Sequence, residues 1–255
     1  MAGAPDGETA GPATKQVAEA ADQTEWRRIH NCDQRSPYVT LDHPALGKKL
    51  MLEQRGSSDP GFVQGTSSVA WPAAVNCIRI LCEKPEVLKG RQVVELGSGI
   101  GLVGAAAAAL GAERVVLTDC EGAIPLLERN RARLAEEGVS NVEVHRIDWG
   151  EDAHHKEILV GPTQQGFDVV LVCDCIVAGF DTERLAQSCL ALLSKAPDAK
   201  LLVAFEYRED WDVIGSFIHT MNEAGLDDSY IPLCAEDADE DDDDIDQFMY
   251  TFTWK

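Results

Sequence analysis

Short apolar runs alternate with segments of helical periodicity from Arg91 onward. The runs predict five strands, at Val93–Leu96, Val115–Thr118, Val142–Ile147, Val169–Val172 and Leu201–Phe205. The helical patterns between and after them begin near Gly101, Glu121, Glu183 and Asp210. Strands that alternate with helices of ~10 to 15 residues predict a parallel sheet, because each parallel crossover is long and right-handed. We therefore expect a doubly wound, Rossmann-like α/β fold.

The last part of the chain has a different pattern. Tyr230–Leu233 and Phe248–Trp254 are apolar runs, the second with apolar or aromatic residues at alternate positions. The acidic stretch between them contains no crossover helix, so the pair predicts an antiparallel C-terminal hairpin. With the five earlier strands, it gives a seven-strand, mostly parallel sheet.

Two short strand patterns precede the α/β region. Tyr38–Leu41 and Lys48–Gln54 flank the turn residues Asp42-His43-Pro44 and predict an N-terminal β-hairpin. Trp71-Pro72 then opens an apolar-periodic helix that runs to Leu81, with proline at a favourable first-turn position.

The composition divides the chain into one main domain with appendages. Its 255 residues are 45% apolar and 26% charged, which is enough hydrophobic material for a core. Residues 1–25 contain no aromatic residue and predict a disordered acidic tail. We expect residues 26–64 to form the hairpin extension and residues 65–255 the main domain, with an acidic loop at 235–246.

The net charge of −22 argues against binding to the phosphate backbone of nucleic acids. Residues 1–25 and the nine carboxylates between Glu236 and Asp246 account for −13 of it. The acidic run is typical of a solvated, flexible loop, since such blocks repel themselves open. A docking patch for a basic partner is the alternative.

Other sequence features restrict the class of protein further. No window approaches the ~18 to 20 apolar residues of a membrane span, and the N-terminus lacks a signal or mitochondrial presequence pattern. We expect no membrane association and a cytosolic or nuclear location. The eight cysteines include no Cys-x-x-Cys pair, which favours reduced core thiols, and the histidines form no metal-ligand pattern.

A glycine loop follows the strand at Val93–Leu96 and leads into an alanine-rich helix. From Gly99 it matches the G-x-G-x-x-G spacing of dinucleotide-binding proteins, in which a pyrophosphate lies on the helix N-terminus. Glu95, two residues before Gly97, would place negative charge beside such a pyrophosphate. It would instead attract S-adenosylmethionine, which carries an ammonium and a sulfonium and no phosphate. Helix capping or a salt bridge is the structural alternative for Glu95.

Asp119 ends the second predicted strand, 22 residues after Gly97. An acidic residue at this place in the sheet binds ribose hydroxyls. Dinucleotides and S-adenosylmethionine both contain a ribose, so Asp119 indicates a nucleoside and does not discriminate between the two cofactors.

The run Glu-Leu-Gly-Ser-Gly-Ile-Gly, followed by Leu-Thr-Asp, resembles the seven-strand class I S-adenosylmethionine-dependent methyltransferases. Residues 65–74 (GTSSVAWPAA), Ile147-Asp148-Trp149-Gly150 and residues 201–208 (LLVAFEYR) are similar to elements of their protein-lysine methyltransferase group, methyltransferase-like family 16. The resemblance implies that the cofactor site is lined by Trp71, Gly97, Ser98, Gly99, Asp119, Asp148, Trp149 and Cys173. The charge argument adds Glu95 to these residues. Asp148 and Trp149 would lie near the adenine.

Two carboxylates end predicted strands at the edge where open α/β sheets bind ligands. Asp174 follows the buried run Val169–Val172, and we expect it to orient an acceptor amine by hydrogen bonds. Glu206 follows the next strand and is a second catalytic candidate. The alternatives are a cap of the following turn for Asp174 and a salt bridge with Arg208 for Glu206.

The family pattern continues from the acidic residue through two others to Tyr or Phe, whereas this sequence has Val177. Valine cannot hold a cationic or methylated amine over an aromatic ring. Phe180 or Tyr207 could take that place, or the acceptor is not a lysine.

The sequence thus predicts a monomeric enzyme that uses S-adenosylmethionine to methylate a lysine side chain of a cytosolic protein. The alternatives are transfer to a small molecule or to another protein nitrogen, and a cofactor-binding interaction module without catalysis. The glycine spacing alone would also allow a dinucleotide oxidoreductase.

Overall fold

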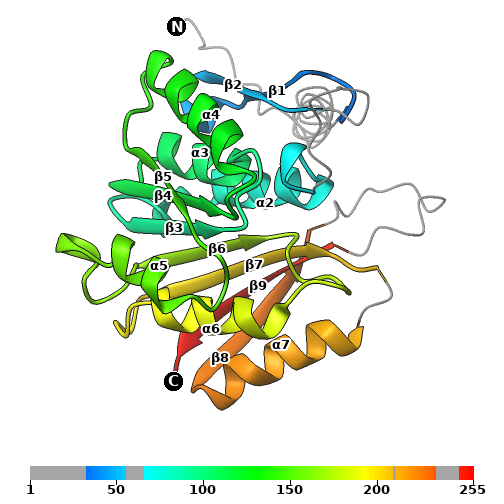
Figure 1. Ribbon diagram of the computed structural model, residues 1–255, viewed down its shortest axis with the longest axis vertical. Coiled ribbons are helices and arrows are strands. Elements are labelled where there is room, and N and C mark those ends of the chain that lie inside the picture. Colours follow the sequence, from blue (N-terminus) through cyan, green and yellow to red (C-terminus); the bar gives the residue numbers. More distant parts are fainter. Residues whose placement is uncertain (1–32, 56–65, 209–210, 234–246) are drawn as a thin grey trace, which may run out of the picture.

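The computed structural model describes residues 33–55, 66–208, 211–233 and 247–255 (Figure 1). Its centre is a seven-stranded sheet in the order β5-β4-β3-β6-β7-β9-β8. The strands are β3 (Gln92–Leu96), β4 (Arg114–Asp119), β5 (Val142–Arg146), β6 (Val169–Cys173), β7 (Lys200–Glu206), β8 (Leu226–Pro232) and β9 (Gln247–Trp254). β3 to β7 are parallel, and β9 and β8 complete the sheet in antiparallel orientation. The predicted fold class is confirmed.

Helices cover both faces of this sheet (Figure 1). One face packs against α2 (Pro72–Glu83), α3 (Leu102–Ala109) and α4 (Ile124–Glu136). The other packs against α5 (Asp152–Ile158), α6 (Thr182–Leu192) and α7 (Trp211–Glu223). Each face therefore has its own hydrophobic core, as a doubly wound sheet requires.

The N-terminal hairpin consists of β1 (Tyr38–Asp42) and β2 (Lys49–Glu53), joined by a 3₁₀ turn at Pro44–Leu46. Its alternating buried residues join the core on the α4 side of the sheet. Asn130 of α4 is fully buried and bonds both backbone groups of Glu53, accepting from its N–H at 2.7 Å and donating to its C=O at 2.9 Å. The predicted hairpin is confirmed over these residues.

Two elements differ from the sequence prediction. α5 was not predicted, because its seven residues carry mostly polar side chains; buried His155 anchors it through Nε2, 3.0 Å from Ser188 Oγ of α6. β8 begins at Leu226 and not at Tyr230, since Asp227, Asp228 and Ser229 are exposed and give no alternating apolar signal. Pairing with β9 orders the start of β8, and the contact of His155 with α6 holds α5, so both elements depend on the folded chain.

Helix α3 packs unusually close to the sheet. Its residues Leu102–Ala108 are buried, and a Cβ placed on Gly104 would lie 2.2 Å from Leu117 Cδ2 of β4. Small side chains thus hold the N-terminus of α3 directly against β3 and β4, and this fixes the glycine turn that joins β3 to α3.

The predicted acidic tail (1–25) and acidic loop (235–246) lie outside the described residues. Across the described ranges, no helix has the length and apolar character to cross a bilayer. Among the same residues Cys77, Cys82, Cys120, Cys173, Cys175 and Cys189 are free thiols.

Candidate active site

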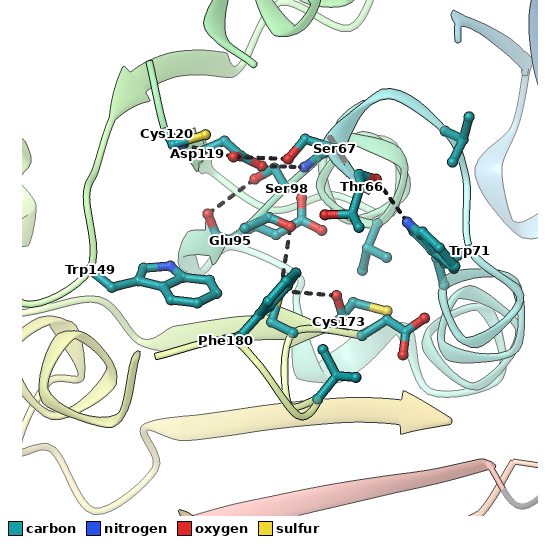
Figure 2. Close-up of a pocket in the computed structure, with 18 of the residues that line it drawn as sticks. Thr66, Ser67, Trp71, Glu95, Ser98, Asp119, Cys120, Trp149, Cys173 and Phe180 are labelled. Carbon is teal, nitrogen blue, oxygen red and sulfur yellow. Dashed lines mark hydrogen bonds between the residues drawn. The ribbon is translucent and has the colours of Figure 1, made fainter. Parts of the chain in front are cut away.

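A cavity of about 770 Å³ opens at the carboxyl ends of β3, β4 and β6 (Figure 2). This is where the sheet order reverses, since β4 lies on one side of β3 and β6 on the other. Open α/β sheets bind ligands at this point, and the volume lies within the usual ~300–1,000 Å³ of cofactor sites. All nine predicted cofactor residues line the cavity: Trp71, Glu95, Gly97, Ser98, Gly99, Asp119, Asp148, Trp149 and Cys173.

The glycine turn forms one wall of this cavity. Gly97 has φ 67°, and a Cβ on it would lie 2.5 Å from Cys175 Sγ and 3.3 Å from the Trp149 ring. Ser98 holds the turn on the sheet, because its hydroxyl donates to Glu95 C=O at 3.1 Å and accepts from Thr118 N–H at 2.9 Å. The backbone at Gly97 therefore approaches the cavity without a side chain in the way.

Asp119 joins the turn to the opposite wall. One carboxylate oxygen accepts from Gly99 N–H at 2.8 Å, and the other accepts from the Ser67 hydroxyl at 3.2 Å and Cys120 N–H at 2.8 Å (Figure 2). Burial raises the pKa of Asp119, and these three donors oppose that shift. The carboxylate is thus held rigidly at the end of β4, the place expected for a ribose-binding acid. Its binding role stays a prediction.

Glu95 lines the cavity but does not stand free beside the turn. Its side chain accepts from Gly104 N–H at 3.0 Å, in the first turn of α3, and the residue is 2% exposed. Burial raises the pKa of Glu95 to about 8. The structure thus shows the helix-capping contact that was the alternative for Glu95. With this pKa the carboxyl group is mostly protonated at pH 7 unless a cation lies nearby. Its role in selecting the cofactor stays a prediction.

Asp148 and Trp149 follow β5 on the far side of the glycine turn. The Asp148 carboxylate accepts from Arg146 Nε at 2.9 Å, and its backbone N–H donates to His154 Nδ1 at 3.1 Å. The Trp149 ring lies over the cavity with its centroid 6.1 Å from that of Phe180 (Figure 2). These contacts fix the position of an aromatic wall for a flat ligand group.

The other end of the cavity is built around an arginine. Asp174 lies just beyond β6 with a side chain 3% exposed, and both its oxygens accept from Arg208, each at 2.8 Å. Arg208 also lies over the Trp71 ring, 5.6 Å from its centroid, and Trp71 donates to Thr66 C=O at 2.9 Å. We call Trp71, Asp174 and Arg208 the arginine end, and Gly97, Gly99 and Asp119 the glycine end.

Asp174 has φ 55°, the one positive φ of a non-glycine residue among those described. A backbone conformation of this kind costs of order 1 kcal/mol and persists at functional sites where the surroundings enforce it. The bidentate pair with Arg208 is one such restraint. The structure therefore holds the Asp174 carboxylate in a fixed direction at the cavity.

Glu206 does not line the cavity. Its carboxylate accepts from Gln247 Nε2 at 3.1 Å and lies 3.6 Å from Arg208 Nε. Gln247 is buried and accepts from Asn76 Nδ2 at 2.6 Å, so Glu206 connects β7 to β9 and α2. The salt bridge that was the alternative for Glu206 is present, and its catalytic role remains a prediction.

Cys173 ends β6 at the cavity wall. A hydrogen bond with the Cys77 thiol and burial both raise the pKa of Cys173, so its thiol is neutral. Val177 and Phe180 line the cavity beside it, whereas Tyr207 does not. Of the two aromatic residues considered in place of a family Tyr or Phe, only Phe180 is at the site.

Several polar or charged residues of the lining were not predicted as site residues, among them Ser67, Cys120, Arg184 and Arg208. Ser67 lies in the motif that was quoted for the family, and Arg208 was considered only as a partner of Glu206. The contact of Ser67 with Asp119 joins residues 52 apart and that of Arg208 with Asp174 joins residues 34 apart, and no local sequence pattern predicts either contact.

The charge of the lining favours a cationic ligand. Four carboxylates, Asp119, Asp148, Asp174 and Asp181, and the mostly protonated Glu95 line the cavity together with two guanidinium groups. Arg208 is paired with Asp174, and Arg184 lies 3.4 Å from Glu151 and 3.7 Å from Asp181. Each basic side chain of the described lining is thus paired with a carboxylate. No group of three potential metal ligands occurs within the described ranges either.

A sequence model of the lysine methyltransferase family matches residues 57–224. The chain belongs to the lysine methyltransferase family. It is 38% identical over 117 residues to the zebrafish (Danio rerio) protein N-lysine methyltransferase METTL21A, covering 44% of this chain and 49% of that protein. It is 32% identical over 165 residues to the Eremothecium gossypii protein N-terminal and lysine N-methyltransferase EFM7, covering 61% and 62%.

The chain is also similar to an arginine methyltransferase and, in fold, to a solved methyltransferase structure. The human histone-arginine methyltransferase METTL23 is 28% identical over 173 residues, 68% of this chain and 86% of that protein. An S-adenosylmethionine-dependent methyltransferase from Mesorhizobium loti has the same fold, with a TM-score of 0.51 at 18% identity over 71% of this chain and 97% of that chain. The chain spans about half to two-thirds of the length of the first two relatives. The predicted membership of the protein-lysine methyltransferase group is confirmed.

Proposed function

We propose that the chain is an S-adenosylmethionine-dependent methyltransferase that acts on the side-chain amine of a lysine in a protein. The observation that carries this proposal is one continuous cavity with two unlike ends. The glycine end offers bare backbone and the Asp119 carboxylate, and the arginine end offers a second fixed carboxylate, Asp174. Membership of the lysine methyltransferase family supports it.

The lining fits this cofactor and does not fit a dinucleotide. Asp119 would bind the ribose hydroxyls, Trp149 would pack against the base, and the backbone at Gly97 would lie along the amino-acid part. The surplus of carboxyl groups in the lining favours a cation over a pyrophosphate. When bound, S-adenosylmethionine supplies an activated methyl group on a positively charged sulfur.

The arginine end would prepare the acceptor amine. Deprotonating a lysine of reference pKa ~10.4 costs about 4.6 kcal/mol at pH 7. Burial of the amine in the cavity would lower this cost because it disfavours the charged form, whereas the Asp174 carboxylate would stabilise the ammonium. The lone pairs of Asp174 that remain beside Arg208 would orient the amine by hydrogen bonds, and its backbone at φ 55° fixes the direction.

Transfer to an arginine is the second candidate. Asp174 already binds one guanidinium in bidentate geometry, and Trp71 lies against the same group. A substrate arginine that displaced Arg208 would find these contacts ready. The similarity to the histone-arginine methyltransferase METTL23 gives this candidate further support.

The test uses the full chain, cofactor labelled in its methyl group, and a protein extract, with a known methyltransferase in parallel. A labelled protein band is expected, and hydrolysis of that band should yield methyl-lysine. Methyl-arginine would favour the second candidate. Label confined to molecules below protein size would indicate a small-molecule acceptor, and no label beside an active parallel enzyme would refute transfer altogether.

We also propose that the substrate is a cytosolic protein, that no nucleic acid is bound and that the chain acts as a monomer. The net charge of −22 supports the second point, because the chain would be repelled by phosphate backbones. Sedimentation of the purified chain tests the third, and location of tagged protein in its source cells tests the first.

A further inference from the structure

Aromatic side chains form a continuous surface beside the arginine end of the cavity. Tyr207 directly precedes Arg208, and its ring centroid lies 4.5 Å from that of Trp211. Trp211 lies 6.1 Å from Phe248, and Phe248 lies 6.0 Å from Tyr230. These four residues, which we call the aromatic surface, connect the cavity rim to the outer strand β8.

The fold brings the aromatic surface to the same edge of the sheet as the cavity. Tyr207 follows the carboxyl end of β7, and Trp211 begins α7 (Figure 1). β9 is antiparallel to β7, so Phe248 at its start pairs with Phe205 near the end of β7. β8 is antiparallel to β9 and pairs Pro232 with Phe248. Three segments thus bring their rings to the edge of the sheet at which the cavity opens, beside the lining and not within it.

Two members of the aromatic surface are large aromatic side chains with about half of their surface exposed to solvent. Trp211 is 49% exposed and Tyr230 is 58% exposed. Contiguous exposed apolar groups of this kind mark interaction sites, and Trp and Tyr dominate the binding energy of protein interfaces. Contacts with Phe248 and Tyr250 bury one part of these rings, and the remaining part is exposed to solvent.

Acidic residues flank two members of the aromatic surface: Asp212 follows Trp211, and Asp228 lies two residues before Tyr230 on β8. Arg208, which follows Tyr207, is paired with Asp174. From residue 211 to residue 233 the chain contains Asp212, Glu223, Asp227 and Asp228 and no lysine or arginine. Aromatic faces attract ammonium and guanidinium groups, and nearby carboxylates strengthen that attraction.

We infer that the aromatic surface binds the segment of the substrate protein next to the methylated residue, and that this segment is extended and carries lysine or arginine together with apolar side chains. The inference rests on the proposed function and specifies the substrate of the same site. An extended chain advances about 3.3 Å per residue, so a few residues beyond the acceptor would reach from Arg208 across Trp211 to Tyr230.

The test measures binding of two fluorescent twelve-residue peptides to the full chain by anisotropy, without cofactor. Both peptides contain the same phenylalanines and leucines; one carries four lysines and the other four glutamates. The variants are Trp211→Ala, Tyr230→Ala and the double variant. Tyr38→Ala is the matched control, because Tyr38 is 41% exposed and lies on the hairpin.

We expect the lysine peptide to bind and the glutamate peptide not to bind. Each single variant should weaken binding about threefold to tenfold, and the double variant should weaken it more, while Tyr38→Ala leaves it unchanged. Trp211→Phe should restore most of the affinity, since it keeps an aromatic face. If an alanine variant fails to fold, Tyr230→Thr keeps the strand propensity of β8 and is used in its place.

Three results would overturn the inference: no binding of the lysine peptide to the unaltered chain, equal loss in Tyr38→Ala, or equal binding of the two peptides. A dimer in sedimentation that the double variant abolishes would assign the surface to a second copy and also overturn it. Because no methyl transfer is measured, an inactive chain would contradict the proposed function and leave the peptide result interpretable.

Discussion

The two ends of the cavity are built in different ways. The glycine end is made mostly of backbone from one continuous stretch, the turn between β3 and α3, with Asp119 as its main side chain. The arginine end is made of side chains from the start of α2, the end of β6 and the end of β7. The glycine end is therefore rigid and preorganised, whereas the arginine end can change its contacts when one side chain moves.

This difference separates the parts of the site that recognise a common ligand from those that choose the acceptor. Helix α3 packs so closely on the sheet that a Cβ on Gly104 would lie 2.2 Å from Leu117 Cδ2. The backbone of the glycine turn, which leads into α3, therefore has little freedom to move. An arginine that is 29% exposed can exchange partners on its carboxylate. We therefore expect substitutions at the glycine end to affect the cofactor and the fold, and substitutions at the arginine end to affect transfer.

The largest effect is expected at Asp174. Asp174→Asn removes the charge that holds Arg208 and replaces one of the two acceptor oxygens by an NH2 donor, so kcat/KM for transfer should fall about a hundredfold. Cofactor affinity, measured by calorimetry, should change less than about threefold. Asp198→Asn, which breaks an exposed Asp–Arg pair with Arg91, is the control and should leave both unchanged. Equal losses of transfer and cofactor affinity in Asp174→Asn would erase the distinction between the two ends.

Two glycine-to-alanine changes in helices should have opposite signs. In Gly104→Ala the new methyl group would lie 2.2 Å from Leu117 Cδ2 and 2.8 Å from Glu95 Oε2, which should lower the free energy of unfolding by about 2 kcal/mol. Gly215→Ala in α7 meets nothing within 4 Å and should raise it by up to about 1 kcal/mol through helix propensity. Chemical denaturation measures both, and a stabilised Gly104→Ala variant would contradict the close packing of α3.

Gly97→Ala tests whether the cofactor binds against the backbone of the glycine turn. The methyl group would lie 2.5 Å from Cys175 Sγ at a residue with φ 67°. The turn must shift, and cofactor affinity should fall at least about tenfold, equivalent to about 1.4 kcal/mol. Gly122→Ala, where nothing lies within 4 Å, is the control. Unaltered cofactor binding in Gly97→Ala would show that the ligand does not approach this backbone.

The smallest effect concerns the protonation of Glu95. Its pKa of about 8 in the free chain should fall when a cation binds beside it, so cofactor binding below pH 8 should release part of one proton. The sign follows from this release: affinity should rise severalfold as the pH increases from 6.5 to 8 and become constant above 8. Calorimetry in buffers of different ionisation enthalpy measures the release.

Glu95→Gln supplies the control for this titration, because glutamine can still accept from Gly104 N–H but cannot ionise. Its cofactor affinity should be independent of pH over the same range. A pH dependence that persists in Glu95→Gln would assign the proton to another group, and Asp119 is the next candidate because burial raises its pKa also.

The comparison of sequence and structure follows the same division. The strands, the hairpin β1–β2 and the glycine end were predictable, because apolar periodicity and a contiguous motif report local backbone directly. Asp174 was predictable from its place after a buried run. The contact that defines it was not, because Arg208 lies 34 residues away and its alternative partner Glu206 is only two residues from it.

Glu95 shows most clearly what a sequence pattern does not reveal, namely the protonation state of a buried group. Its charge looked decisive in the sequence, yet its neutral form is favoured once β3 and α3 close around it. Local sequence patterns are enough to determine strands, turns and helices, since these elements depend on backbone geometry and on the periodicity of apolar side chains. The sequence by itself therefore determined the layered α/β sheet, the glycine turn and the family.

The tertiary structure decided which charges are paired, which are neutral and which surface is left uncovered. It placed Glu206 in a bridge to Gln247, Phe180 and not Tyr207 at the cavity, and four aromatic rings side by side at its rim. Electrostatic energies depend on distance and burial in three dimensions, and neither quantity is encoded in spacing along a chain.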